Sequence, residues 1–362
     1  MAATLEGLER DGLLRPAGAA DAVDGVAAEL VAEPASVQEA SELLAAASRA
    51  GLRMAFAGGG GKLALGNPPE RLDLLVSTRR LGRVLEHAAG DLVVKAEAGA
   101  RLADLQAALE PAGQWLALDP PEPGATVGGV VAANASGPRR LRYGTVRDLI
   151  IGITVVLADG TMARAGGKVV KNVAGYDLAK LFCGSLGTLG LVAEATFRLH
   201  PRPAAAAVVA LGVERPEQAG EAVRRLLRST LEPSAIELTR AGPAEPGRLT
   251  VVFEGIRPGV EAQATNAARL LGEVADAEVL TIEGLGTIED PHPLQQAFID
   301  EHAAQCGYCI AGMVMSASAL LSQNASPSDG EIREALAGNL CRCGTHASIL
   351  RAVQRAAGEM SV

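Results

Sequence analysis

Apolar and polar positions in the N-terminal half of the chain switch repeatedly between helical and strand periods. A capping box at Ser36 and Glu39 begins an amphipathic helix with Leu43 and Leu44 on its apolar side, and Gly51 fits its C-terminal end. The runs "RMAFA", "RLDLLV" and "DLVVKAE" are typical of strands, and "RLADLQAALEPAG" is typical of a helix. The segment "DLIIGITVVLADGTMARA" predicts a hairpin that turns at Asp159-Gly160. Together these patterns predict an α+β domain.

The pattern changes beyond about Pro203. Residues 205–281 have the order strand, helix, strand, strand, helix, strand, and this βαββαβ order is typical of a ferredoxin-like fold. From Pro291 the runs are helical, and a second capping box stands at Ser328 and Glu331. We therefore expect a lead-in at residues 1–22, an α+β domain at 23–204, a ferredoxin-like domain at 205–281 and an all-α domain at 282–362.

Composition supports several globular domains. The 362 residues exceed what one hydrophobic core usually organises, and 48% hydrophobic with 21% charged residues is an ordinary globular balance. A net charge of −9 argues against a nucleic-acid surface. No apolar run has the length of a membrane span, and the first residues lack the layout of a signal peptide. We therefore expect a cytoplasmic protein, in which clustered cysteines more often bind metal than form disulfides.

The first glycine-rich stretch, Gly58–Gly61, follows a predicted strand and precedes Lys62. Successive glycines allow backbone N–H groups to point at an anion. The stretch has neither the G-x-G-x-x-G pattern nor the ending of a P-loop. The residues alone leave two interpretations open, an anion-binding loop and a flexible turn.

Two further stretches share this small-residue character. The segment "EPGATVGGVVAANASGPRRLRYGTVRDLIIG" suits close packing and offers N–H and hydroxyl donors. Four arginines in or near it can neutralise a pyrophosphate or form a solvated basic face: Arg139, Arg140, Arg142 and Arg147. The third stretch, "KVVKNVAGYDLAKLFCGSLGTLGLVAEATFRLHP", adds Gly184, Gly187 and Gly190.

These three stretches resemble the PCMH-type FAD-binding domain of the vanillyl-alcohol oxidase superfamily. Over about residues 25–280 the chain is similar to the FAD-binding subunit of bacterial glycolate oxidase, and "KNVAGYD" and "GSLGTLG" are the most distinctive parts. The resemblance implies FAD held non-covalently, because no histidine lies among the glycines of these stretches; His200 stands at the end of the third stretch, beyond Gly190. The flavin-binding positions that it implies are Gly58, Gly59, Gly60, Gly61, Lys62, Thr126, Gly128, Gly129, Asn134, Ser136, Gly137, Gly144, Asp148, Gly187 and Val192.

The same resemblance extends into residues 205–281, which look like a truncated cap domain over the flavin. It implies a small-molecule substrate, glycolate or another 2-hydroxy acid. Relatives that bind a metal beside the flavin use histidines of the cap, and this segment has no such pair. We therefore expect the chain to act with other oxidoreductase subunits.

Two tight cysteine pairs stand near the C-terminus, Cys306-x2-Cys309 and Cys341-x-Cys343. Four thiolates are the ligand count of a structural zinc site and of an iron–sulfur cluster. The C-x-C spacing of the second pair departs from a zinc ribbon and favours the cluster, but zinc stays open. The fifth cysteine, Cys183, is predicted to be a small buried residue.

The cysteine region resembles the C-terminal domain of the iron–sulfur subunit of molybdenum hydroxylases, the xanthine dehydrogenase family. "HPLQQAFIDEHAAQCGYCIAGMVMSASALL" and "GNLCRCGTH" carry the resemblance, which covers about residues 280–357. It implies a 2Fe-2S cluster bound by the four cysteines within an all-α four-helix domain. Gln305 matches a glutamine that faces the molybdopterin of a partner protein, although a helix cap is its plainer interpretation. The ferredoxin domain with which that family's iron–sulfur protein begins is absent.

Together the two resemblances imply an FAD-dependent oxidoreductase component that moves electrons between flavin and a 2Fe-2S cluster. The expected partners are a molybdopterin subunit or glycolate oxidase subunits. Two alternatives remain: a fusion whose cluster domain belongs to a molybdenum hydroxylase complex, and a flavoprotein with a structural zinc site.

Overall fold

The structure, a computed structural model, consists of two compact units, Met1–Arg202 and Pro203–Val362. The boundary between the units falls where the sequence pattern changes. The structure describes residues 12–168, 177–242, 245–272, 274, 277–280, 285–286, 290–304, 310–337, 339 and 345–360.

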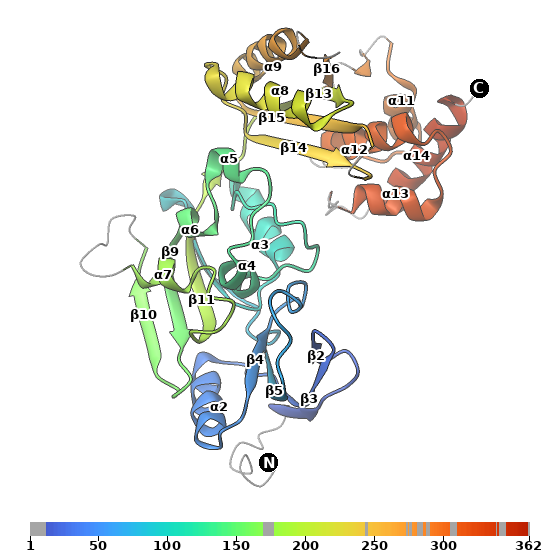
Figure 1. Cartoon of the computed structure of the whole chain (residues 1–362). Coiled ribbons are helices and arrows are strands. Elements are labelled where there is room, and N and C mark those ends of the chain that lie inside the picture. Colours follow the sequence, from blue (N-terminus) through green and yellow to red (C-terminus); the bar gives the residue numbers. More distant parts are fainter. Residues whose placement is uncertain are drawn as a thin grey trace. The chain divides into compact units, whose positions relative to one another are not determined.

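The first sheet of unit 1 is mixed and has the strand order β1-β3-β5-β4, with β2 paired to β3 (Figure 1). Its strands are β1 (Leu14–Pro16), β2 (Ala22–Val23), β3 (Val26–Ala32), β4 (Met54–Ala57) and β5 (Leu72–Ser77). Because β1 pairs with β3, Leu14–Pro16 are part of this sheet, although they fall within the lead-in expected at residues 1–22. Three residues are too few to show alternation, so the local pattern contains no sign of β1.

Helix α2 (Val37–Arg49) packs against this sheet and begins as the sequence predicts. The hydroxyl of Ser36 accepts a hydrogen bond from the N–H of Glu39 at 3.1 Å, which satisfies one of the unpaired donors of the first turn. Leu43 and Leu44 are fully buried in the core.

The second sheet of unit 1 is antiparallel, in the order β10-β9-β11-β7-β6. Its strands are β6 (Val84–Ala88), β7 (Val93–Glu97), β9 (Ile150–Val156), β10 (Met162–Gly166) and β11 (Leu191–Arg198). The β9–β10 hairpin turns at Asp159-Gly160 as predicted, and Gly160 has a φ of +87°. A separate short ladder joins β8 (Gln114–Trp115) to β12 (His200–Pro201).

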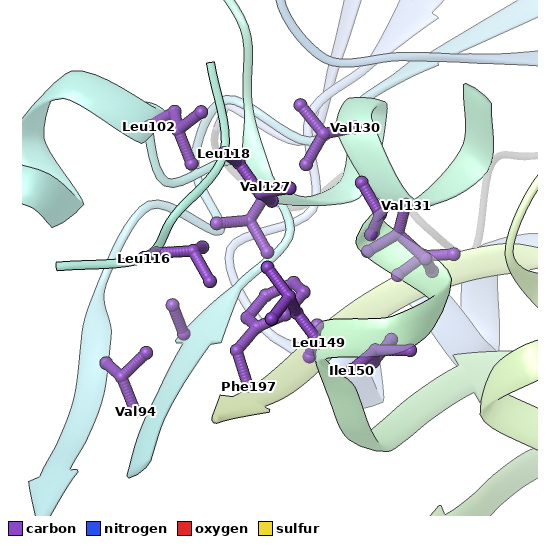
Figure 2. Close-up of a cluster of buried hydrophobic side chains, with 14 of the residues drawn as sticks. Val94, Leu102, Leu116, Leu118, Val127, Val130, Val131, Leu149, Ile150 and Phe197 are labelled. Carbon is purple, nitrogen blue, oxygen red and sulfur yellow. The ribbon is translucent and has the colours of Figure 1, made fainter. Parts of the chain in front are cut away.

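Helices cover this second sheet and complete the main core of unit 1. They are α3 (Leu102–Leu109), α4 (Val127–Ala133), α5 (Arg140–Tyr143), α6 (Val146–Leu149) and α7 (Leu178–Phe182), with 3-10 turns at Ala89–Asp91 and Glu110–Ala112. Figure 2 shows Phe197 of β11 among Val127 and Val131 of α4, Leu149 and Ile150. The core therefore holds α4 against the sheet.

Unit 2 begins with the βαββαβ order that the sequence predicts. The elements are β13 (Ala205–Val213), α8 (Pro216–Arg228), β14 (Ala235–Arg240), β15 (Gly247–Gly255), α9 (Arg257–Gly272) and β16 (Ala277–Leu280). The strands form an antiparallel sheet in the order β14-β15-β13-β16. Val209, Val251 and Phe253 of the sheet share one core with Leu226 of α8 and Leu271 of α9.

The C-terminal part that the structure describes contains the helices α11 (Pro293–Asp300), α12 (Ile310–Gln323), α13 (Asp329–Leu336) and α14 (His346–Met360). They share a second core, and the capping box of Ser328 and Glu331 begins α13 as predicted. Arg351 and Arg355 of α14 form ion pairs with Glu301 at 2.9 Å and Asp300 at 2.6 Å. Among the described residues, no helix is long and apolar enough to cross a membrane.

Phe197 offers a direct test of the core of unit 1, because its side chain is fully buried. We expect Phe197→Ala to lower the free energy of unfolding by about 3–5 kcal/mol, through lost burial and the cavity that remains. Trp115 is the one tryptophan of the chain and lies in unit 1, so urea unfolding followed by tryptophan fluorescence measures the effect. Leu181→Ala, at a side chain that is 58% exposed on α7 of the same unit, is the control. An unchanged midpoint in Phe197→Ala would contradict this account of the core.

Candidate functional site

The first glycine loop, Gly58–Gly61, leaves the end of β4 and lies directly against the second glycine-rich segment. A Cβ atom on Gly59 would lie 1.9 Å from the carbonyl oxygen of Gly124, and one on Gly58 would lie 2.1 Å from Oγ1 of Thr126. A side chain at Gly59 would force the backbone to move, and one at Gly58 would displace the hydroxyl of Thr126. Lys62 and Glu122 form an ion pair that joins the same two segments. Two stretches that the sequence singled out separately therefore form one site.

The backbone N–H groups of this first loop are available to a ligand. Within the described part of the chain, no hydrogen bond takes up the N–H groups of Gly58–Gly61. Gly60 has a φ of +82°, a conformation that favours glycine. Successive unpaired N–H groups in such a turn form a concave site of positive potential, which suits a phosphate.

The second segment uses its backbone donors internally. Thr126 begins α4, and its Oγ1 accepts a hydrogen bond from the N–H of Gly129 at 3.3 Å. The N–H of Gly128 donates to the carbonyl oxygen of Ala98 at 2.7 Å, and a Cβ on Gly128 would lie 2.7 Å from the Cβ of Ala98. We expected this segment to offer N–H donors, and for Gly128 and Gly129 that expectation was wrong. Gly128 lets α4 approach Ala98, which follows β7.

The C-terminal end of α4 is fixed by Asn134, whose backbone has a φ of +47°. Its Oδ1 accepts hydrogen bonds from the N–H of Arg147 and from the thiol of Cys183, both at 3.3 Å. Cys183 is buried, as expected, and burial raises the pKa of its thiol to about 11. The thiol therefore stays protonated near neutral pH and keeps its hydrogen bond to Asn134.

The third glycine segment closes on the same end of α4. The N–H groups of Gly184 and Leu186 donate to the carbonyl oxygens of Val131 and Ala132 at 2.9 and 2.8 Å. Gly187 follows in contact range of Phe56 on β4, the strand that leads into the first loop. The first glycine segment therefore lies against the beginning of α4 and the third against its end, while α4 itself belongs to the second segment.

The remaining predicted positions shape the backbone around α5 and α6. Ser136 Oγ accepts from the N–H of Val146 at 3.2 Å, and a Cβ on Gly137 would lie 2.0 Å from the carbonyl oxygen of Asp119. Gly144, with a φ of +84°, ends α5. Asp148 accepts two hydrogen bonds from Thr145, and these bonds lower the pKa of the Asp148 carboxyl.

Val192 differs from the other predicted positions. Its side chain lies in the core, and its backbone pairs with Val155 in the sheet. Its contribution is therefore to the sheet beneath the loops.

Three buried polar atoms beside these loops have no hydrogen-bond partner among the described residues: Oε2 of Glu122, Oδ1 of Asp119 and Oγ of Ser185. Burial raises the pKa of Asp119, whose other oxygen accepts from the N–H of Arg139 at 3.1 Å. Buried polar atoms without partners are uncommon and mark places where a ligand completes the bonding. Together with the free N–H groups of the first loop, they fit a ligand that carries both phosphates and hydroxyl groups.

Glu122 and Ser185 were not among the flavin-binding positions predicted from the sequence. A polar residue within a glycine- or proline-rich loop could have indicated each of them: Glu122 is the acid in "PPEPG", and Ser185 stands between the glycines of "CGSLG".

The second candidate site is the predicted iron–sulfur site near the C-terminus. Its predicted residues lie outside the described part of the chain: Cys306, Cys309, Cys341, Cys343 and Gln305. Residues 171–176 of "KNVAGYD" are outside it as well.

Some residues a few positions from the cysteines are described, among them Gly312, Ser316 and Asn339. Nδ2 of Asn339 donates to Oγ of Ser316 at 2.6 Å, and a Cβ on Gly312 would lie 2.6 Å from Oδ1 of Asn339. Asn339 therefore connects the chain just before the second cysteine pair to α12, which begins just after the first pair.

Comparison with protein families identifies two domains. A family described as "FAD binding domain" matches residues 28–166, and a family described as "[2Fe-2S] binding domain" matches residues 281–354. One of the subunits of nicotinate dehydrogenase from Pseudomonas putida is 52% identical over 116 residues, which are 32% of this chain and 70% of that protein. Glycolate oxidase subunit GlcE of Escherichia coli is 39% identical over 181 residues, which are 49% of this chain and 50% of that protein. The chain thus spans half the length of GlcE.

Solved structures support the fold of the chain. Alkyldihydroxyacetonephosphate synthase superposes with a TM-score of 0.66 at 19% sequence identity, over 77% of this chain and 60% of that one. At this identity the likeness is one of fold alone.

The environment of Cys183 predicts low reactivity. Because burial raises the pKa of its thiol to about 11, alkylation of native Cys183 by iodoacetamide should be slow at neutral pH and should accelerate only in strong alkali. Peptide mass spectrometry after timed labelling measures this. The urea-unfolded protein is the control, in which Cys183 should react at the rate of an ordinary thiol. Fast labelling of native Cys183 at neutral pH would show that the thiol is not held as described.

Proposed function

We propose that the chain moves electrons between FAD and a 2Fe-2S cluster, because an FAD binding domain family matches residues 28–166 and a [2Fe-2S] binding domain family matches residues 281–354. The observation that carries this proposal is the joining of the glycine segments into one site with unpaired N–H groups. FAD, when bound, supplies the chemistry of electron-pair transfer. The residues of the chain bind the cofactors, orient them and exclude water. We also propose that the protein works in a reducing, cytoplasmic compartment, where clustered cysteines more often bind metal than form disulfides.

Each segment around α4 has a separate role in this proposal. The N–H groups of Gly58–Gly61 would receive the pyrophosphate, since they are the free donors of the site. The unpartnered carboxylate oxygen of Glu122 would accept a hydrogen bond from a hydroxyl group of the cofactor, and the hydroxyl of Ser185 would donate or accept one. Thr126, Gly128 and Gly129 would set the position of α4, and Asn134 would anchor its other end.

The segment from Ser136 to Asp148 would hold the backbone beside the flavin. The two hydrogen bonds from Thr145 keep the Asp148 carboxyl ionised, so its role is to fix the start of α6 and not to transfer a proton.

The four cysteines Cys306, Cys309, Cys341 and Cys343 would bind the cluster as thiolates. Their number and type suit a 2Fe-2S cluster. The contact of Asn339 with Ser316 and Gly312 supports this assignment, because it connects the flanks of the two pairs.

The substrate that we propose is a 2-hydroxy acid. The support is the similarity to a glycolate oxidase subunit, half of whose length the chain spans. Other subunits would therefore complete the enzyme. A molybdopterin subunit is a second candidate partner, because the cluster domain is 52% identical to part of a nicotinate dehydrogenase subunit.

The visible spectrum of anaerobically purified protein, with chemical analysis, tests the proposal. We expect flavin bands together with iron–sulfur absorption, two iron atoms and two acid-labile sulfides for each cluster. Zinc without iron would overturn the cluster assignment. Absence of flavin after incubation with FAD would overturn the flavin assignment.

Gly59→Ala tests the flavin loop. The added methyl group overlaps the carbonyl oxygen of Gly124, so the loop must move and FAD should bind at least about tenfold more weakly, a loss of one good hydrogen bond. FAD titration followed by flavin fluorescence measures the change. Gly90→Ala is the matched control, because no atom lies within 4 Å of a Cβ there. Equal affinity in Gly59→Ala and wild type would contradict the proposed role of the loop.

Gly312→Ala tests the flank of the cluster. The methyl group would displace the Asn339 side chain, which should lower the iron and sulfide content and change the circular dichroism of the cluster. Gly358→Ala on α14 is the matched helical control, with open space around the added methyl. If both variants retain the wild-type spectrum and iron content, Gly312 has no part in positioning the cysteine pairs.

A further inference from the structure

Three aromatic rings gather beside the short β8–β12 ladder in unit 1. Trp115 and His200 face each other in register, so their side chains lie on the same side of the ladder. Leu116 and Leu199, their neighbours in sequence, are buried in the core. The ring of Tyr143 contacts both of the others edge-on, with centroids 5.4 Å from Trp115 and 5.1 Å from His200. We name Trp115, Tyr143 and His200 the ring cluster.

The ring cluster and its neighbour Arg198 contain buried nitrogen atoms that lack partners. Nε1 of Trp115, Nε2 of His200 and Nε of Arg198 are all buried and have no hydrogen-bond partner in the described part of the chain. An indole and a guanidinium can only donate, and an imidazole nitrogen can donate as well. Buried donors of this kind are normally paired, so the site lacks acceptor atoms. A ligand that binds here must supply oxygen acceptors.

The charged groups around the ring cluster are mainly arginines: Arg139, Arg142 and Arg198. Arg139 forms an ion pair with Asp119, and the pKa of Asp148 is lowered by hydrogen bonds from Thr145 and, less strongly, by the charge of Arg198. Arg198 precedes His200 by two residues, so along extended chain the two side chains point to the same side. Burial lowers the pKa of His200, and the charges of Arg198 and Arg142 lower it further. The guanidinium of Arg142 also lies 5.8 Å from the centre of the Tyr143 ring. Unpaired donors in a positive environment favour an anion.

The residue types gathered here favour a small organic anion. The aromatic rings suit a short carbon skeleton, and the unpaired donors suit the two oxygens of a carboxylate and one neighbouring oxygen. Tyr143 also precedes Gly144, one of the proposed flavin positions, so the ring cluster adjoins the flavin segment along the chain.

We propose that Trp115, Arg198 and His200 bind the carboxylate of a small organic acid. This inference rests on the proposed function and deepens it, since it gives the 2-hydroxy acid substrate a place in unit 1. The shared chemistry is that of an oxyanion, and inorganic phosphate is the rival occupant. No covalent step is involved.

Trp115 reports on this site directly, because the chain has one tryptophan. The full-length protein loaded with FAD is titrated with oxalate, a small carboxylate that has no C–H bond to oxidise. We expect a saturable change in tryptophan fluorescence, with the affinity confirmed by calorimetry. Inorganic phosphate, titrated separately, should bind more weakly.

Two variants and one control assign the effect. His200→Phe keeps a ring without its N–H groups, and Arg198→Met keeps an unbranched side chain without its charge. Each should weaken oxalate binding about tenfold or more, as expected for loss of a hydrogen bond to a charged group. Arg49→Met, at an exposed arginine in the last turn of α2, should bind oxalate as wild type does. Urea unfolding of each variant confirms that it folds.

The inference is overturned if oxalate produces no saturable response, if His200→Phe and Arg198→Met bind it as wild type does, or if phosphate binds more tightly. A protein that contains flavin and cluster but fails this test retains the proposed function and loses the carboxylate site. A protein without flavin loses the proposed function, whatever oxalate does.

Discussion

The close approach of two backbone segments is the constraint on which the candidate flavin site depends. Gly58 and Gly59 lie so near Gly124 and Thr126 that a single methyl group at either glycine would overlap an oxygen atom. This contact places a loop with free N–H groups beside the start of α4. The ion pair of Lys62 with Glu122 joins the same segments from the side. The two segments can meet because Gly58 and Gly59 have no side chains, and this contact fixes the direction of the backbone N–H groups of the loop.

The rest of unit 1 maintains that contact from the two ends of α4. At the beginning of the helix, the N–H of Gly128 is bonded to Ala98, which follows β7. At its end, Asn134 accepts from Arg147 and Cys183, and the Gly184 segment bonds to the last carbonyl groups. Buried residues such as Phe197 support the helix from below. The helical part of unit 2 has a related feature, in which Gly312 allows Asn339 to approach α12; both residues lie close in sequence to the cysteine pairs.

Local signals in the sequence were sufficient for much of the fold. The helix start at Ser36, the capping box at Ser328, the turn at Asp159-Gly160 and the βαββαβ order each depend on residues that are close in sequence, and each was confirmed. The capping box at Ser36 is only half formed, because the carboxylate of Glu39 accepts from the N–H of Ala35 and not from that of Ser36. Features that depend on distant partners were missed. Strand β1 has only three residues, so it can be recognised only through its pairing with β3. The hydrogen bond of Gly128 depends on Ala98, and the ring cluster depends on the pairing of Trp115 with His200, so neither could be read from the local pattern.

The central claim is that FAD and a 2Fe-2S cluster on one chain exchange electrons. Light-driven reduction of the flavin by EDTA, followed anaerobically by visible and electron paramagnetic resonance spectroscopy, tests it most directly because the light reaction delivers electrons to the flavin. The account predicts that the signal of the reduced cluster appears as the flavin is reduced, and that it is lost in Cys306→Ser and Cys341→Ser. A flavin that becomes fully reduced while an intact cluster stays oxidised would contradict it.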